Sequence, residues 1–60
     1  PVRVDVFDIM GRRVINLVDD VLTPGFYSVD WNVENEPGGL YTYRLSAGKQ
    51  TETRKIIVNR

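Results

Sequence analysis

Residues 39–45, with the sequence GLYTYRL, carry the clearest structural signal in this chain. Tyr41, Tyr43 and Leu45 occupy every second position, so an extended strand would carry all three side chains on one face. Aromatic and aliphatic residues on one side of a strand favour packing against other apolar groups. The stretch therefore predicts a β-strand with one buried side.

Other short runs along the chain have the same character and predict further strands. In the first run Val2, Val4 and Val6 alternate along the sequence, and β-branched residues favour strands. The expected strands are residues 2–7, 13–18, 26–31, 40–47 and 51–58. Short strands that follow one another at a spacing of about ten residues are typical of a sandwich or barrel.

Glycine and aspartate mark the expected turns. Asp8 and Gly11 predict a tight hairpin of about four or five residues, because Asp can hydrogen-bond its own backbone and Gly readily takes a positive φ. Gly48 and Lys49 predict a second turn. The apolar residues of 13–18 do not alternate cleanly, and a β-bulge near Asn16 would account for this.

These elements predict an all-β fold, a small antiparallel immunoglobulin-like sandwich of about five strands. Residues 1–60 are too few for more than one domain. An immunoglobulin-like sandwich normally has about seven strands in about 100 residues. We therefore expect one or two strands at the N-terminal side to be missing. The expected core consists of Val4, Val6, Val29, Trp31, Tyr41, Tyr43, Leu45 and Ile56.

The composition excludes several classes of function. Eight Lys and Arg balance eight Asp and Glu along the chain, unlike the clustered positive charge of a nucleic-acid-binding domain. The absence of Cys and His excludes a disulfide framework, a zinc ribbon and a catalytic triad built on His or Cys. No apolar run reaches the length of a membrane span. We expect no enzyme activity, no cofactor, no nucleic-acid partner and no membrane span.

The aromatic residues allow a second interpretation, as a sugar-binding platform. The four rings concerned belong to Tyr27, Trp31, Tyr41 and Tyr43. Such rings could hold a glycan through stacking and hydrogen bonds, but their alternation with aliphatic residues favours a place in the core. Phe7 and Phe26 lie on the opposite faces of their expected strands, so they are the candidates for exposed contacts.

Charged pairs leave two further alternatives open. Asp19 with Asp20, and residues 34–36, could offer oxygen ligands to calcium, although their spacing is not that of an EF-hand. Solvated loop charge is the simpler interpretation. The basic pairs at 12–13 and 54–55 could contact an anionic partner, but they are more typical of charges that discourage the pairing of sheet edges.

Four stretches resemble, in order, the motifs of a bacterial C-terminal domain family. Residues 4–14 resemble its opening hairpin, V-x-V-Y/F-D-x-x-G-R-x-V, and residues 25–31 resemble its G-x-H/Y-x-V-x-W strand. Residues 37–45 resemble its L/P-x-G-V/L-Y-x-Y-R/K-L strand, and residues 53–58 its closing T-x-K-I/L/M-I/V-V/L strand. The family is that of the type A sorting domains of the type IX secretion system, which are similar to the immunoglobulin-like domain of the flagellar hook-capping protein.

The resemblance implies a role in export. It implies a non-catalytic C-terminal sorting module of a larger exported protein, recognised by the secretion machinery at the outer membrane and carried to the exterior or the cell surface. The expected recognition strand contains Lys55, Ile56, Ile57 and Val58, with strand 39–45 as its scaffold, and could be read by strand addition. The alternative is an accessory sandwich joined to a secreted enzyme, acting as a spacer, an adhesion domain, a hook-cap-like assembly domain or a carbohydrate-binding module.

Members of this family also carry a segment with a further strand upstream of the hairpin, and this chain lacks it. Its absence leaves a sheet edge or one flank of the core uncovered. We therefore expect a domain of the parent protein, an upstream strand or a second copy of the chain to cover this flank. The isolated chain is expected to be weakly stable, because so short a chain buries little surface.

Overall fold

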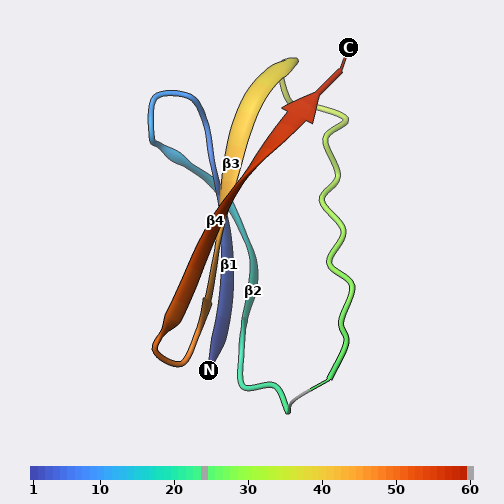
Figure 1. The fold of residues 1–60 in the computed structure, drawn as a ribbon. Coiled ribbons are helices and arrows are strands. Elements are labelled where there is room, and N and C mark those ends of the chain that lie inside the picture. The colour runs from blue at the N-terminus through green and yellow to red at the C-terminus, as the bar shows by residue number, and fades with distance from the viewer. Residues whose placement is uncertain (24, 60) are drawn as a thin grey trace.

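The computed structural model describes residues 1–23 and 25–59 and contains one antiparallel β-sheet, with no helix in these ranges (Figure 1). Its strands are β1 (Val2–Phe7), β2 (Arg13–Asp20), β3 (Gly39–Ala47) and β4 (Gln50–Val58). Their spatial order is β2-β1-β3-β4, so β2 and β4 are the two edges. The predicted all-β class is confirmed, and the arrangement is consistent with a small immunoglobulin-like sandwich.

The register of β1 against β3 sorts the side chains onto two faces. Val4 lies opposite Leu45, and Val6 lies opposite Tyr43. Residues opposite each other in a sheet point to the same side. We call this side the core face and the other side, which carries Asp5, the back face. The alternation predicted for both strands is therefore present in the sheet.

The core is small and centres on three buried side chains. Val6, Tyr41 and Val58 are 0%, 6% and 7% exposed. Around them pack the partly buried side chains of Val14, Leu17, Trp31, Val33, Tyr43 and Ile56. The ring of Trp31 meets that of Tyr41 edge to face, with 5.1 Å between centroids, and the Tyr41 hydroxyl donates a hydrogen bond to the Pro37 carbonyl at 2.6 Å. The connection between β2 and β3 is thereby held against the sheet.

The residues expected in the core differ in burial. Val4, Val6 and Tyr41 are buried, and Trp31, Tyr43, Leu45 and Ile56 are half-buried. Val29 requires a correction, because it is 45% exposed. It lies on a single extended segment, and within the described ranges no neighbouring strand flanks that segment to cover its side chains.

The prediction of a strand at residues 26–31 is wrong, because these residues do not pair with any strand of the sheet. These residues belong to a long extended connection that runs beside the sheet and is not part of it (Figure 1). A ladder needs a second chain about 4.8 Å away in the plane of the sheet, and this connection is the only described segment in its layer. The alternation of Tyr27, Val29 and Trp31 is still informative, because these three side chains line the same apolar groove with residues of the core face.

The β1–β2 hairpin turns through five residues, 8–12, in the manner predicted. The Asp8 N–H donates to the Arg12 carbonyl at 2.9 Å, and the Gly11 N–H donates to the Asp8 carbonyl at 3.0 Å. The Asp8 carboxylate accepts the N–H groups of Met10 at 2.9 Å and Arg12 at 3.0 Å. The Arg12 N–H bond is the main reason why the pKa of Asp8 lies below its usual value.

We expect the substitution Gly11→Ala to lower the free energy of unfolding by about 1–2 kcal/mol. Gly11 has a φ of 82°, and a Cβ built there would meet nothing within 4 Å, so the cost is one of backbone conformation alone. Gly11→Asn should cost less, because Asn tolerates this region better than Ala. Urea unfolding of the three proteins measures the order, and equal stabilities would contradict it.

The β3–β4 hairpin is tighter. Ala47 pairs with Gln50, which leaves the two-residue turn Gly48 and Lys49. Gly48 has a φ of 61°, and no residue other than glycine has a positive φ in the described part of the chain. A positive φ at the first turn residue alone is the pattern of a type II′ turn, whose twist suits a hairpin.

Candidate recognition surface

The two edges of the sheet differ in regularity. Along β2 the register against β1 shifts twice, between Val4 and Asp5 and between Val6 and Phe7. Each shift leaves one residue of β2 without a partner, first Leu17 and then Val14. Both residues pack on the core, which explains why the apolar residues of β2 do not alternate. The first shift is the bulge expected near Asn16, and such irregularity makes β2 a poor template for another strand.

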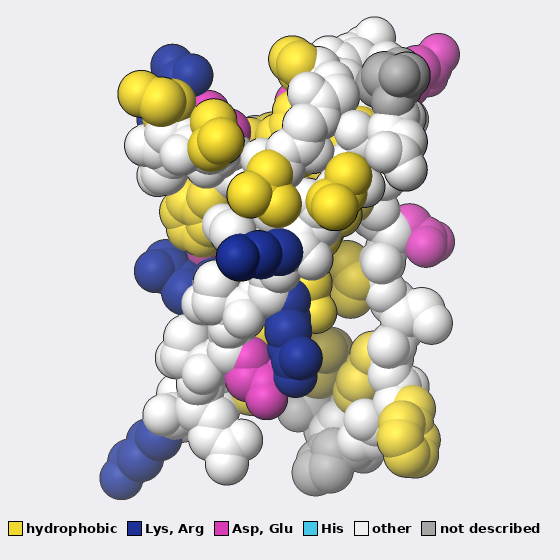
Figure 2. All heavy atoms as spheres, turned by 45° about the horizontal axis from the view of Figure 1, so that its top comes forward, with side chains coloured by type: hydrophobic (Ala, Val, Ile, Leu, Met, Phe, Trp, Pro, Cys, Tyr) yellow, Lys and Arg dark blue, Asp and Glu magenta, His cyan; other side chains and the backbone are white. Residues whose placement is uncertain are grey.

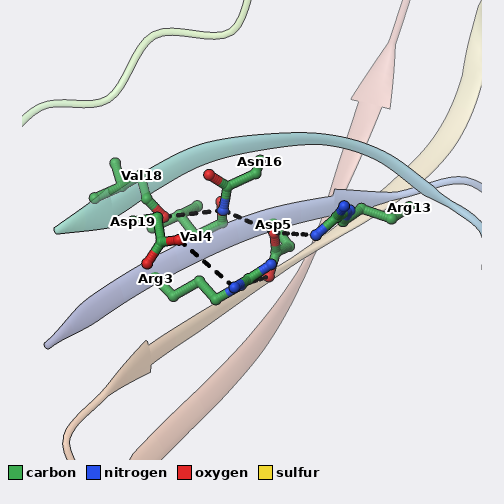
Figure 3. Close-up of polar contacts among 7 residues, drawn as sticks. All are labelled: Arg3, Val4, Asp5, Arg13, Asn16, Val18 and Asp19. Carbon is green, nitrogen blue, oxygen red and sulfur yellow. Dashed lines mark hydrogen bonds and ion pairs between the residues drawn. The ribbon is translucent and has the colours of Figure 1, made fainter.

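A polar cluster on the back face holds the first bulge in place (Figure 3). The Asn16 side-chain amide donates to the carbonyls of Val4 and Val18 at 3.3 and 3.0 Å, and to the Asp5 carboxylate at 2.9 Å. The amide thus bridges the two strands at the point where the backbone ladder is interrupted. Arg3 binds the same carboxylate through its Nε at 2.7 Å, and Arg13 approaches it at 3.9 Å.

Asp5 is the one charged residue in the described ranges that is buried, at 2% exposure. Burial by itself would raise its pKa. The hydrogen bonds from Arg3 and Asn16, with the charges of Arg3 and Arg13, outweigh burial and bring the pKa below its usual value. Asp5 was not predicted from the sequence as a buried residue, although Arg3 lies two positions before it and the predicted hairpin brings Asn16 opposite it.

The other edge, β4, is regular. All nine of its residues pair with β3 without a register shift, from Gly39 opposite Val58 to Ala47 opposite Gln50. As an edge strand, β4 directs alternate N–H and C=O groups away from the sheet. A second extended chain could bind these groups.

The four residues expected to form the recognition strand divide between the two faces of β4. Lys55 lies opposite Thr42 on the back face and is exposed, and Ile57 on the same face is 70% exposed. Ile56 and Val58 point to the core face, where Ile56 is half-buried and Val58 is buried. A partner at this edge can therefore reach the backbone and two of the four side chains.

The sequence matches the family described as secretion system C-terminal sorting domain over residues 1–59. The chain belongs to this family. Comparison with curated proteins and with solved structures gave no significant match. A type IX sorting domain directs export through the outer membrane to the exterior or the cell surface, and the secretion machinery recognises it. No helix within the described ranges has the length and apolar character that a membrane crossing requires.

The two phenylalanines proposed for exposed contacts lie far apart on this sorting domain. Phe7 is half-buried at the hairpin end of β1, and the Arg44 guanidinium lies 5.0 Å from its ring centre. Phe26 is 106% exposed and belongs to the extended connection between β2 and β3, which begins at the end of the sheet where the N-terminus lies (Figure 1). The two rings therefore do not form one contact surface.

An apolar groove of about 430 Å³ separates the core face from the connection between β2 and β3. Its lining includes Val2, Val4, Leu17, Val18, Leu22, Tyr27, Val29, Trp31, Tyr43, Leu45 and Ile56. Hydrophobic side chains are visible in the opening between the strands and this connection in Figure 2. The groove shows that the short chain does not fill the space between its sheet and its second layer.

The aromatic residues of the sorting domain do not form a flat platform for a sugar. Tyr41 is buried, and Trp31 meets its edge at an interplanar angle of 74°. Of the four rings considered, only that of Tyr27 is more than half exposed, at 55%. In the described ranges no three Asp, Glu, Cys or His side chains converge as a metal ion would require, and the acidic pair Asp19 and Asp20 ends strand β2.

Proposed function

We propose that the chain acts as a non-catalytic C-terminal sorting module of a larger exported protein, and that the secretion machinery recognises strand β4. The observation that carries this proposal is the difference between the two sheet edges. β2 is interrupted by two bulges, whereas β4 is unbroken over nine residues and ends the sheet on its other side. A regular edge of this length suits recognition by strand addition, in which backbone hydrogen bonds supply affinity.

Side chains on β4 supply the specificity in this proposal. Lys55 and Ile57 project from the back face, one charged and one apolar, at alternate positions of the strand. Strand addition typically uses pockets for alternate side chains beside the backbone ladder. Val58 contributes in a different way, because its buried side chain anchors the end of β4 to the core.

The proposal is tested by fusing the chain, with the residues that precede it in the parent protein, to the C-terminus of a reporter in a bacterium that has type IX secretion. We expect the reporter to reach the cell surface or the medium. Ile57→Thr, which keeps a β-branched residue in the strand and removes apolar surface, should lower delivery several-fold and leave reporter in the periplasm. Fractionation and immunoblotting measure the distribution.

The matched control is Ile9→Thr. Ile9 is the same residue type, 76% exposed, and lies in the β1–β2 hairpin rather than on β4. The substitution Ile9→Thr should leave delivery of the reporter unchanged. A wild-type fusion that stays in the periplasm would refute the sorting role and favour the accessory-module alternative. Normal delivery by Ile57→Thr and by Lys55→Glu would refute β4 as the recognition strand while leaving the sorting role intact.

A further inference from the structure

We infer that β4 is also a homodimer interface, in which two copies of the chain pair antiparallel about Thr53 to form one continuous sheet. This inference concerns the chain in solution and does not depend on which protein binds β4 during export. It rests on the regular edge and on the order of charges along β4.

The order of charges selects one register. In a symmetric antiparallel pair, a residue on the twofold axis lies opposite itself, and residues at equal distances on either side lie opposite each other. With Thr53 on the axis, Glu52 lies opposite Arg54 of the second copy, and Arg54 lies opposite Glu52 of the second copy. Opposite charges in directly facing positions stabilise strand pairs.

Neighbouring registers are less favourable. Placing Glu52, Arg54 or Lys55 on the axis brings each charge opposite its own copy, and like charges directly opposite are destabilising. Placing Ile56 on the axis avoids this clash but leaves only residues 54–58 paired, because β4 ends at Val58. The Thr53 register pairs the longer stretch, residues 50–56, and places the two Thr53 side chains together on the back face.

The charged pair that this register uses is available at the surface. Glu52 and Arg54 lie on the core face of β4, opposite Leu45 and Tyr43 of β3. Their side chains are 61% and 63% exposed and stand 3.8 Å apart within one chain. An exposed pair at this distance contributes little to the stability of the monomer. Glu52 and Arg54 can therefore pair with the second copy instead of with each other at little cost in free energy, and both charges then lie at the interface.

The exposed area of the chain leaves room for such an interface. The chain exposes 4992 Å², whereas a compact monomer of 6.9 kDa would expose about 4,000 Å². The excess of roughly 1,000 Å² is comparable with the area that each partner buries in an interface of standard size. A second copy paired along β4 buries part of this exposed surface, and the charge order of β4 selects that second copy as the occupant.

Charge reversal tests the register. We expect sedimentation velocity to show dimerisation of the wild-type chain that rises with concentration, and Glu52→Arg or Arg54→Glu to weaken it about tenfold or more. The double variant E52R/R54E restores opposite charges and should recover dimerisation. An equimolar mixture of the two single variants should form heterodimers, since one copy then carries two cations and the other two anions. Circular dichroism verifies that each variant is folded.

A cysteine placed on the axis tests the geometry directly, because the chain has no cysteine of its own. Cα atoms of facing residues lie about 4.5–5.5 Å apart, within the range of a disulfide, so Thr53→Cys should form a disulfide-linked dimer on mild oxidation. Thr51→Cys is the matched control on the same face, since its two copies would lie about 14 Å apart along the strands. A monomer at all concentrations, charge variants that dimerise as well as the wild type, or equal cross-linking at both positions would overturn the inference.

Discussion

Replacing Tyr41 with alanine should remove most of the stability of this fold, lowering the free energy of unfolding by about 3–5 kcal/mol. Tyr41 is 6% exposed, packs against the edge of Trp31 and holds the Pro37 carbonyl through its hydroxyl. A chain of 60 residues has roughly 3–9 kcal/mol to lose. Urea unfolding followed by the fluorescence of Trp31, the single tryptophan, measures the change, and much of the variant should be unfolded without denaturant.

Two further variants separate the contributions of the Tyr41 ring and hydroxyl. Tyr41→Phe keeps the ring and loses the hydrogen bond to Pro37, so it should cost only about 1 kcal/mol. Tyr27→Ala removes a ring of the same type that is 55% exposed, and should cost well under half as much as Tyr41→Ala. If Tyr41→Ala unfolds at the same urea concentration as Tyr27→Ala, the core does not centre on Tyr41.

Residue alternation was enough to predict the sheet itself. The pattern of Tyr41, Tyr43 and Leu45 placed one face of β3 in the core, and the pattern of Val2, Val4 and Val6 did the same for β1. The positions of glycine predicted both hairpins, because Gly11 and Gly48 take the positive φ values that those turns need. Local chemistry and period-two burial act within a few residues, which is why they can be read from one sequence.

The second layer could not be predicted in the same way. Residues 26–31 have the composition and alternation of a strand, yet whether an extended segment joins a ladder depends on another segment beside it. Here Tyr27, Val29 and Trp31 face the sheet across an apolar groove, without a strand beside them in the part of the chain that the structure describes. Alternation predicts which side of a segment is apolar but not which backbone it pairs with.

The buried charge was missed for a related reason. Alternation assigns Asp5 to the polar back face, where a carboxylate would ordinarily be solvated. Its 2% exposure arises because Arg3, Arg13 and Asn16 converge on it from two strands. This convergence depends on how β2 pairs with β1, and the alternation within one strand does not show which side chains of the next strand lie opposite.

Replacing Asp5 with asparagine should lower the free energy of unfolding by about 1–3 kcal/mol at pH 7, because hydrogen bonds to a charged group are lost while the shape is kept. The matched control is Asp19→Asn. Asp19 stands 3.7 Å from Arg3, but its side chain is 67% exposed, so its removal should change stability by less than about 0.5 kcal/mol. Urea unfolding of the three proteins at pH 7 measures both effects.

The stability difference between the wild type and Asp5→Asn should depend on pH with a definite sign. The pKa of Asp5 is lowered in the folded protein, so the folded state binds fewer protons than the unfolded state below about pH 4, the ordinary value for Asp. The contribution of the carboxylate is then complete above that pH and is lost as the pH falls through the lower pKa of the folded state. Asp8, whose pKa is also lowered, is present in both proteins, so its contribution cancels in the difference. A difference that stays constant from pH 7 to pH 2 would show that the negative charge of Asp5 does not set its contribution to stability.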